Sequence, residues 1–132
     1  MWIRGGLLLL GLFHLVNGLF MLAAPEYWYG AVPGVSQTGP INHHFIADIA
    51  LAFLSSGAGL ILGTSRARFA GFAALAGATW PALHALLHIW GSINEGLPAT
   101  AKELVSTGIG VIVVGALGLA LAWLRIRQQE NA

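Results

Sequence analysis

Four long apolar stretches dominate this chain and limit the folds that it can adopt. They cover roughly residues 2–23, 41–62, 69–90 and 101–123. A helix of about 20 residues spans the hydrocarbon core of a bilayer, which is about 30 Å thick. Charged residues make up 8% of the chain, whereas soluble domains carry about 25%. The sequence therefore predicts one all-α domain, a four-helix transmembrane bundle spanning residues 1–132.

The first apolar stretch has a second interpretation as a secretory signal peptide. Arg4 would be its basic n-region, and Leu22-Ala23-Ala24 resembles a cleavage site. The stretch is long for a signal peptide, and Pro25 follows the site directly, which is unfavourable for cleavage. We therefore expect a retained membrane helix.

Residues 24–40 form the longest stretch that we expect to be non-helical. Pro25, Pro33 and Pro40 interrupt any regular helix there. The aromatic run Tyr27-Trp28-Tyr29 suits a membrane interface, and a loop of this length is often functional. The loop is either an aromatic anchor or a lid over a site.

The basic residues predict how the bundle is oriented. In a four-span arrangement, five arginines share one side, and Lys102 is on the other. These arginines are Arg4, Arg66, Arg68, Arg125 and Arg127. The positive-inside rule then predicts cytoplasmic N and C termini, with loop 24–40 and the turn at 91–98 outside. We expect the polar tail from Arg125 to Ala132 to be frayed.

Local signals predict one helix start, one kink and one close helix contact. Thr100 and Glu103 have the spacing of a capping box at the start of the fourth helix. Pro81 lacks the N–H that would bond the Gly77 carbonyl, so the third helix can bend there. The small residues Ala73 and Gly77 would let another helix approach closely.

Two polar pairs interrupt the apolar helices. His84 and His88 are four residues apart, and so are His44 and Asp48. Residues at this spacing lie on one face of a helix. In antiparallel helices ending near residues 41 and 90, we expect His44 to lie level with His88, and Asp48 level with His84. Ionisable groups within a membrane normally face the bundle interior and pair with one another.

These four side chains predict a metal site near the outer leaflet. Imidazole and carboxylate ligands suit zinc, iron or copper. The same residues leave two other interpretations open. Asp48 and His84 could form a purely structural hydrogen bond between helices. Haem b, which we favour less, could use His44 or His14 together with His84 or His88 as axial ligands.

Two further polar residues on the first helix fall near the same depth. Asn17 is about level with Asp48 and His84, and His14 lies about one turn deeper. We expect both to contribute to binding a cofactor or substrate. The chain lacks the Glu-x-x-His pairs of di-iron bundles and the His-Glu-x-x-His motif of zinc proteases.

The leading functional interpretation is a metal-binding membrane protein, with a small oxidoreductase as one form of it. Its substrate would be a lipophilic or periplasmic small molecule, and whether it is an enzyme stays open. Alternatives are an accessory subunit of a membrane complex, a homo-oligomer, or a proton-coupled carrier using Asp48. The formal net charge of +1 gives no footprint for nucleic acid. The absence of cysteine excludes thiolate metal sites.

One motif carries a family resemblance. Trp28-Tyr29, Val32-Pro33-Gly34-Val35, Thr38-Gly39-Pro40 and Asn42-x-His44-Phe45-x-x-Asp48 resemble a group of small four-helix bacterial membrane proteins. The run from Ala82 to Trp90 looks like the third helix of the same group. This group is loosely similar to DoxX-like proteins. The resemblance implies a four-helix fold in a bacterial inner membrane and implies no activity.

Overall fold

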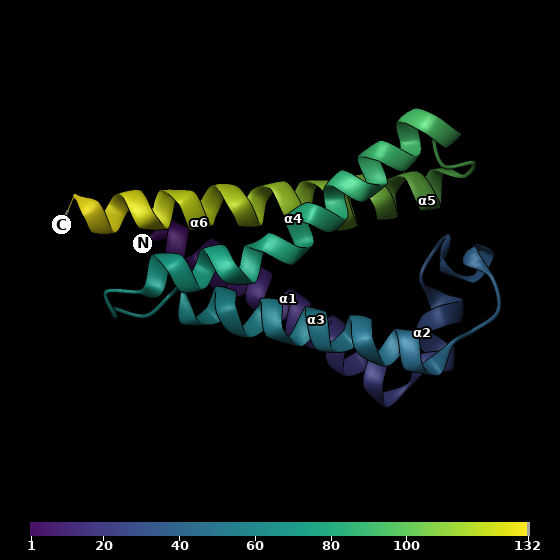
Figure 1. Cartoon of the computed structure of the whole chain (residues 1–132), viewed down its shortest axis with the longest axis horizontal. Helices are drawn as coiled ribbons and strands as arrows, with labels where there is room; N and C mark the ends of the chain where they lie inside the picture. The colour runs from purple at the N-terminus through teal and green to yellow at the C-terminus, as the bar shows by residue number, and fades with distance from the viewer. Residues whose placement is uncertain (132) are drawn as a thin grey trace.

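The computed structural model describes residues 1–131, whose regular secondary structure is helical, with no β-strand. Ala132, the end of the predicted tail, lies outside that range. Figure 1 shows α1 (Trp2–Ala23), α2 (Pro25–Ala31), η1 (Val35–Thr38), α3 (His43–Leu62), α4 (Ala70–Glu95), α5 (Ala101–Val105), η2 (Ser106–Val113) and α6 (Val114–Glu130). α5, η2 and α6 form one continuous helical rod of 30 residues. Four helices are thus long and apolar enough to cross a membrane, as predicted.

Several helix ends follow from local sequence. Asn42 caps α3 by accepting a hydrogen bond from the backbone N–H of Phe45 at 3.0 Å. Thr100 and Glu103 form the predicted capping box at the start of α5. Gly96 follows the end of α4 with a φ of 96°, a backbone conformation that glycine adopts readily.

α4 is longer than the sequence indicated. We expected it to end near residue 90, but it continues to Glu95. The Ser92 hydroxyl donates to the His88 carbonyl at 2.9 Å, so a polar residue that favours turns is accommodated inside the helix. The five extra residues place His84 and His88 about 7 Å further from the helix end than expected.

Part of the stretch at 24–40 is helical, which corrects our prediction. Pro25 occupies the first turn of α2, where its missing N–H would have had no helical partner. The second helical segment, η1, is a short 3-10 turn after Gly34. Trp28 is buried and packs with Met21 and Ile46, so α2 is fixed against α1 and α3.

The helices associate as two pairs. α1 packs mainly on α3, α4 packs on η2 and α6, and the contact of α3 with α4 joins the pairs. Figure 1 shows both termini beside the α3–α4 turn, which we call the termini end. α2, η1 and α5 lie at the other end, which we call the α2 end, and the pairs diverge toward it.

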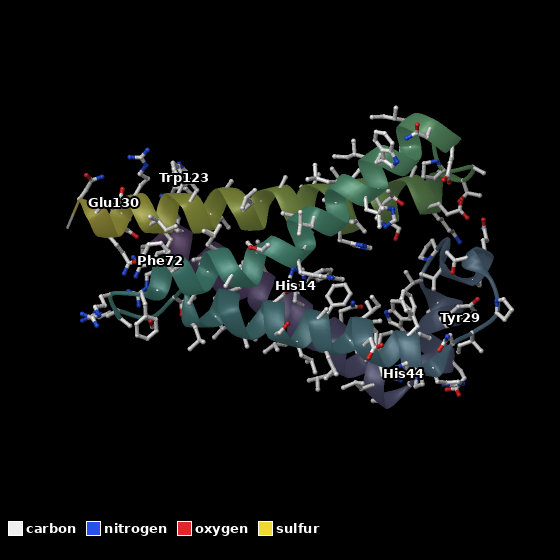
Figure 2. All side chains as sticks on the ribbon, in the orientation of Figure 1. His14, Tyr29, His44, Phe72, Trp123 and Glu130 are labelled. Atoms are coloured by element: carbon white, nitrogen blue, oxygen red, sulfur yellow. The ribbon has the colours of Figure 1, made fainter. Side chains whose placement is uncertain are left out.

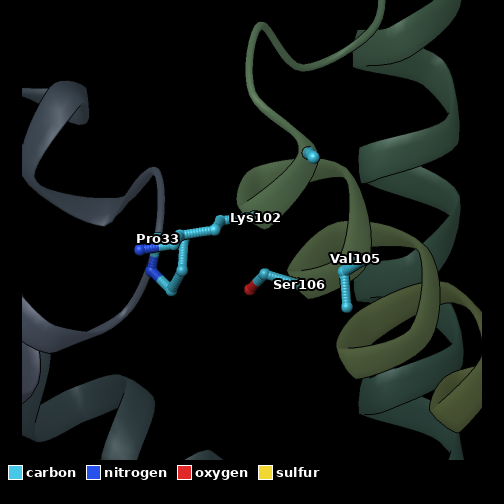
Figure 3. A pocket seen from close by; sticks show the side chains of 5 residues that line it. Pro33, Lys102, Val105 and Ser106 are labelled. Carbon is cyan, nitrogen blue, oxygen red and sulfur yellow. The ribbon is translucent and has the colours of Figure 1, made fainter.

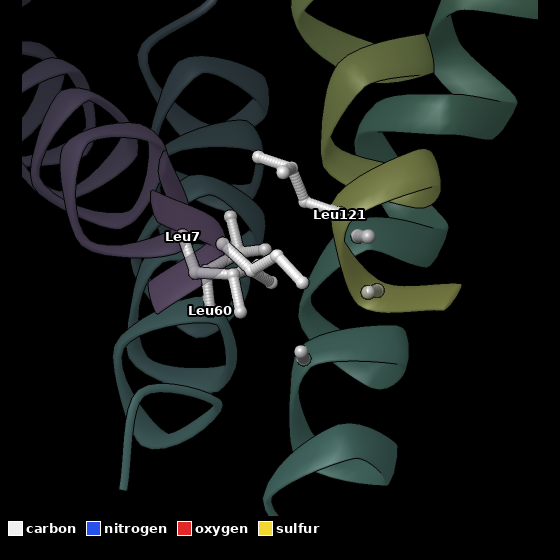
Figure 4. Packing of buried hydrophobic residues seen from close by; sticks show 7 residues of the cluster. Leu7, Leu60 and Leu121 are labelled. Atoms are coloured by element: carbon white, nitrogen blue, oxygen red, sulfur yellow. The ribbon is translucent and has the colours of Figure 1, made fainter. Parts of the chain in front are cut away.

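The apolar core at the termini end draws on all four long helices. Leu7, Leu60 and Leu121 meet there and are at most 4% exposed (Figure 4). The small residues Ala74 and Ala78 of α4 complete the cluster. The core therefore holds the two pairs together at this end.

Backbone contact between α3 and α4 depends on glycine. A Cβ added at Gly77 would lie 2.6 Å from the Leu60 nitrogen and 2.6 Å from the Ser56 oxygen. These separations are too short for any side chain. The predicted close approach at Gly77 is therefore confirmed, with Gly59 as its neighbour on α3.

The bend in α4 follows from Pro81, which lies inside the helix. Proline in a helix interior removes one hydrogen bond and clashes with the preceding turn. Figure 1 shows the second half of α4 turning away from α3. Because of this bend, the part of α4 after Pro81 lies beside the gap that opens between the two helix pairs.

Our prediction of a frayed tail from Arg125 is wrong, because α6 continues to Glu130. Arg125 is only 7% exposed. Its guanidinium donates to the Gly63 carbonyl at 3.0 Å and to the Ser65 carbonyl at 2.7 Å. This arginine therefore fixes the end of α6 to the α3–α4 turn.

Candidate functional site

His84 and His88 share one face of α4. Their imidazole rings meet edge to face with centroids 4.7 Å apart. Trp80, one turn earlier, stacks its indole on His84 with centroids 5.1 Å apart and planes 8° apart. The stacked indole restricts the orientation of the His84 ring, so the pair is held from one side.

Rings from α1 and α3 extend this arrangement across the protein. Phe53 meets Trp80 edge to face at 4.8 Å, and His14 meets Phe53 in the same way at 5.5 Å. We call His14, Phe53, Trp80, His84 and His88 the ring row. In Figure 2, His14 lies close to where the helix pairs begin to diverge. The row therefore runs from the interior of the bundle toward the α2 end.

His14 is the most deeply buried member of the ring row, with 2% of its surface exposed. Within residues 1–131, its Nδ1 is a buried nitrogen with no hydrogen-bond partner. A buried polar atom without a partner costs about 1–3 kcal/mol. The predicted cofactor-binding role of His14 stays a prediction, and this free nitrogen is compatible with it.

His44 and Asp48 form a separate pair. His44 Nε2 lies 3.4 Å from Asp48 Oδ2, and the two side chains are 90% and 56% exposed. Asp48 falls midway between Ile46 and Ala50, which are both buried. Residues two apart on a helix point to different sides, so Asp48 lies away from the core-facing side of α3.

The structure therefore does not bring the four predicted ligands together. Asp48 pairs within its own helix at 3.4 Å, and no ion pair joins it to His84 in the part of the chain described. Among residues 1–131, no three His, Asp or Glu side chains converge in a way that could hold a metal ion. Of the four predicted ligands, His84 and His88 remain in contact with each other on α4.

Asn17 has a structural contact at the α2 end. Its side-chain oxygen accepts a hydrogen bond from Trp28 Nε1 at 3.1 Å, which ties α2 to α1. Its Nδ2 lies 3.8 Å from Met21 Sδ. The predicted cofactor-facing role of Asn17 stays a prediction, and its amide oxygen already has a partner.

The segment at 32–40 reaches across to the other helix pair. Gln37 donates a hydrogen bond to the carboxylate of Glu103, which is 8% exposed. Beside this contact, Pro33 faces Lys102 and Ser106 across a shallow hollow of about 460 Å³ (Figure 3). The predicted aromatic loop is thus anchored at Trp28 and bridges the two pairs at Gln37.

A second hollow, of about 340 Å³, opens beside His88. It is formed by Leu87, His88, Gly91, Ser92, Glu95, Gly96, Pro98 and Thr107. Thr107 belongs to η2, a π-helix of eight residues. π-helical segments are rare and are frequently found at functional sites. This hollow therefore borders His88, whose side chain is partly exposed.

Comparisons of the chain with protein-family models, with curated proteins and with solved structures found no match.

Sequence reasoning missed three residues of this region. Phe53 and Trp80 were indistinguishable from other apolar core residues, because their ring contacts depend on the packing of α3 against α4. Glu95 was assigned to a turn, although its spacing carried a signal. His84, His88, Ser92 and Glu95 recur every three or four residues and so follow one helix face.

Proposed function

We propose that this protein is a multi-pass membrane protein that crosses the bilayer four times, with both termini in the cytoplasm. Four helices have suitable length and composition. Many large apolar side chains, such as Leu9, Val16 and Phe72, are more than 60% exposed on the bundle surface, where lipid would cover them. The arginines gather toward the termini end, which supports the orientation. The family resemblance suggests a bacterial inner membrane.

Within that setting, the pair His84 and His88 binds a divalent transition-metal ion. The observation that carries this proposal is the proximity of the two rings, with centroids 4.7 Å apart on one face of α4. Imidazole is a ligand for zinc, copper and iron alike. The stacked indole of Trp80 limits the freedom of His84 before any ion binds, which lowers the entropic cost of binding.

Two protein ligands leave coordination positions open for water or a small molecule. A metal bound in this way acts as a Lewis acid and lowers the pKa of a bound water. His88 borders the 340 Å³ hollow, so an exchangeable ligand could reach that side of the ion. The exposed pair His44 and Asp48 has no part in this two-residue site.

Metal titration of the purified chain tests the proposal. The protein in detergent is stripped with a chelator and titrated with Cu²⁺ or Zn²⁺, and bound metal is measured after desalting. We expect nearly equimolar binding, lost in His84→Ala and His88→Ala. His44→Ala is the matched control, because this histidine is 90% exposed on α3 and should leave binding unchanged.

Two results would contradict the proposal. Wild-type protein that retains no metal would remove the site. Equal loss in His44→Ala and His84→Ala would restore the four-residue site predicted from the sequence. If the wild-type protein retains no metal, the rings of His84 and His88 serve packing alone. The role of an accessory subunit in a larger complex then becomes the better interpretation.

A further inference from the structure

We propose that the metal arrives as a hydrated divalent cation from the α2 end, through the hollow beside His88, and that Glu95 attracts it there. The inference rests on the proposed function, because it concerns how the pair His84 and His88 is filled. It assigns a role to Glu95, Ser92 and Thr107, which have none in the two-residue site itself.

The polar residues of this hollow form a graded path along one face of α4. Glu95 is exposed at the helix end, and Ser92 and His88 follow one turn apart toward the interior. His84 lies one further turn inward, in ring contact with His88. Glu95 is seven residues from His88, a rise of about 10 Å along the helix. The path therefore joins the exposed helix end to the two ligands.

Each group on this path suits a cation that is losing its water. The Glu95 carboxylate supplies a negative charge at the entrance. The Ser92 hydroxyl donates to the His88 carbonyl, so its oxygen lone pairs stay free to accept or coordinate. Thr107 supplies a second hydroxyl from the facing wall. Lys102, a repelling charge, is not among the residues of this hollow and lines the other one.

The charge of Glu95 should speed association and leave dissociation unchanged. The Coulomb attraction between a divalent ion and one carboxylate about 10 Å away in water raises the encounter rate about fourfold. The Trp80 indole stacks on His84, so Cu²⁺ bound there should quench its fluorescence. Stopped-flow mixing of the full-length protein with Cu²⁺ therefore reports both rate constants.

We expect Glu95→Gln to lower the association rate constant about fourfold at low ionic strength. The difference should vanish at about 1 M salt, where the Debye length is about 3 Å. Glu26→Gln is the matched control. Glu26 is also an exposed carboxylate, but it lies on α2 beside His43 and does not line this hollow. Trp80→Phe identifies the part of the signal that comes from this indole.

A second variant tests the route independently of charge. Thr107→Phe places a ring in the hollow and should slow association and dissociation by similar factors, with little change in affinity. Unchanged rates in Glu95→Gln and Thr107→Phe would overturn the inference, as would an equal slowing in Glu26→Gln. If the wild-type protein shows no Cu²⁺ signal and binds no metal, the proposed function itself fails. Failure of the entry path alone would instead leave equimolar binding intact.

Discussion

The contact of α3 with α4 at Gly77 determines where the ring row lies, and Gly77→Ala is the most direct perturbation of it. An added Cβ would lie 2.6 Å from the Leu60 nitrogen and the Ser56 oxygen. This is about 0.8 Å short of the 3.4 Å at which ordinary van der Waals contact begins. Both clashing atoms belong to the backbone, so no side-chain rotation can relieve the overlap.

The loss of stability in Gly77→Ala can be estimated from how far the two helices must move apart. Moving them apart by about 0.8 Å loses part of the attraction among the tightly packed residues at this seam. Overpacking of this kind costs about 1–3 kcal/mol. The same shift would separate Phe53 from Trp80, whose rings now lie 4.8 Å apart across the two helices. We therefore expect Gly77→Ala to lower both stability and metal affinity.

Gly91→Ala is the control for stability, because it makes the same change in the same helix. A Cβ at Gly91 would meet nothing within 4 Å. Alanine in a helix interior is favoured over glycine by about 0.5–1 kcal/mol, so this variant should be neutral or stabilised. Thermal or SDS-induced unfolding in detergent, followed by circular dichroism, measures both variants. Equal stability of Gly77→Ala and Gly91→Ala would refute the assigned α3–α4 contact.

Two further predictions concern buried polar groups. Arg125→Met leaves the Gly63 and Ser65 carbonyls without their donor, and should lower the free energy of unfolding by about 2–3 kcal/mol in the same assay. Arg127→Met removes an exposed cation over an indole and an exposed ion pair with Glu130, and should cost about 0.5–1 kcal/mol, so equal losses would contradict this account. His14→Leu removes the partnerless Nδ1 at similar volume and should raise stability by about 1 kcal/mol. A clear loss of stability in His14→Leu would contradict the assigned cost of this nitrogen.

Patterns that act within one helix could be predicted from the sequence. The capping box at Thr100 and Glu103 involves neighbours in the chain, so spacing alone fixed its geometry. The bend at Pro81 likewise follows from a missing N–H. The pairs His44 with Asp48 and His84 with His88 each share a helix face, because residues four apart meet on a helix.

The expected pairing of Asp48 with His84 required information from two helices and did not form. It assumed that α4 ends near residue 90 and that Asp48 faces α4. The helix instead runs to Glu95, and Asp48 lies on the side of α3 away from its core. The rotation of a helix depends on which small residues permit backbone contact. Here Gly77 lies against Gly59, and the sequence did not show which residue of α3 would meet Gly77.

Hydropathy and helical periodicity are local properties, so the four apolar helices, their approximate positions and the placement of His84 beside His88 could be predicted without knowing the fold. The packing of the helices on one another set which faces meet. It joined His14, Phe53 and Trp80 into one row, buried Arg125 against the α3–α4 turn, and separated Asp48 from the interior. Contacts between helices depend on rotation, depth and bend together, and a shift of one residue along a helix changes all the neighbours of a side chain.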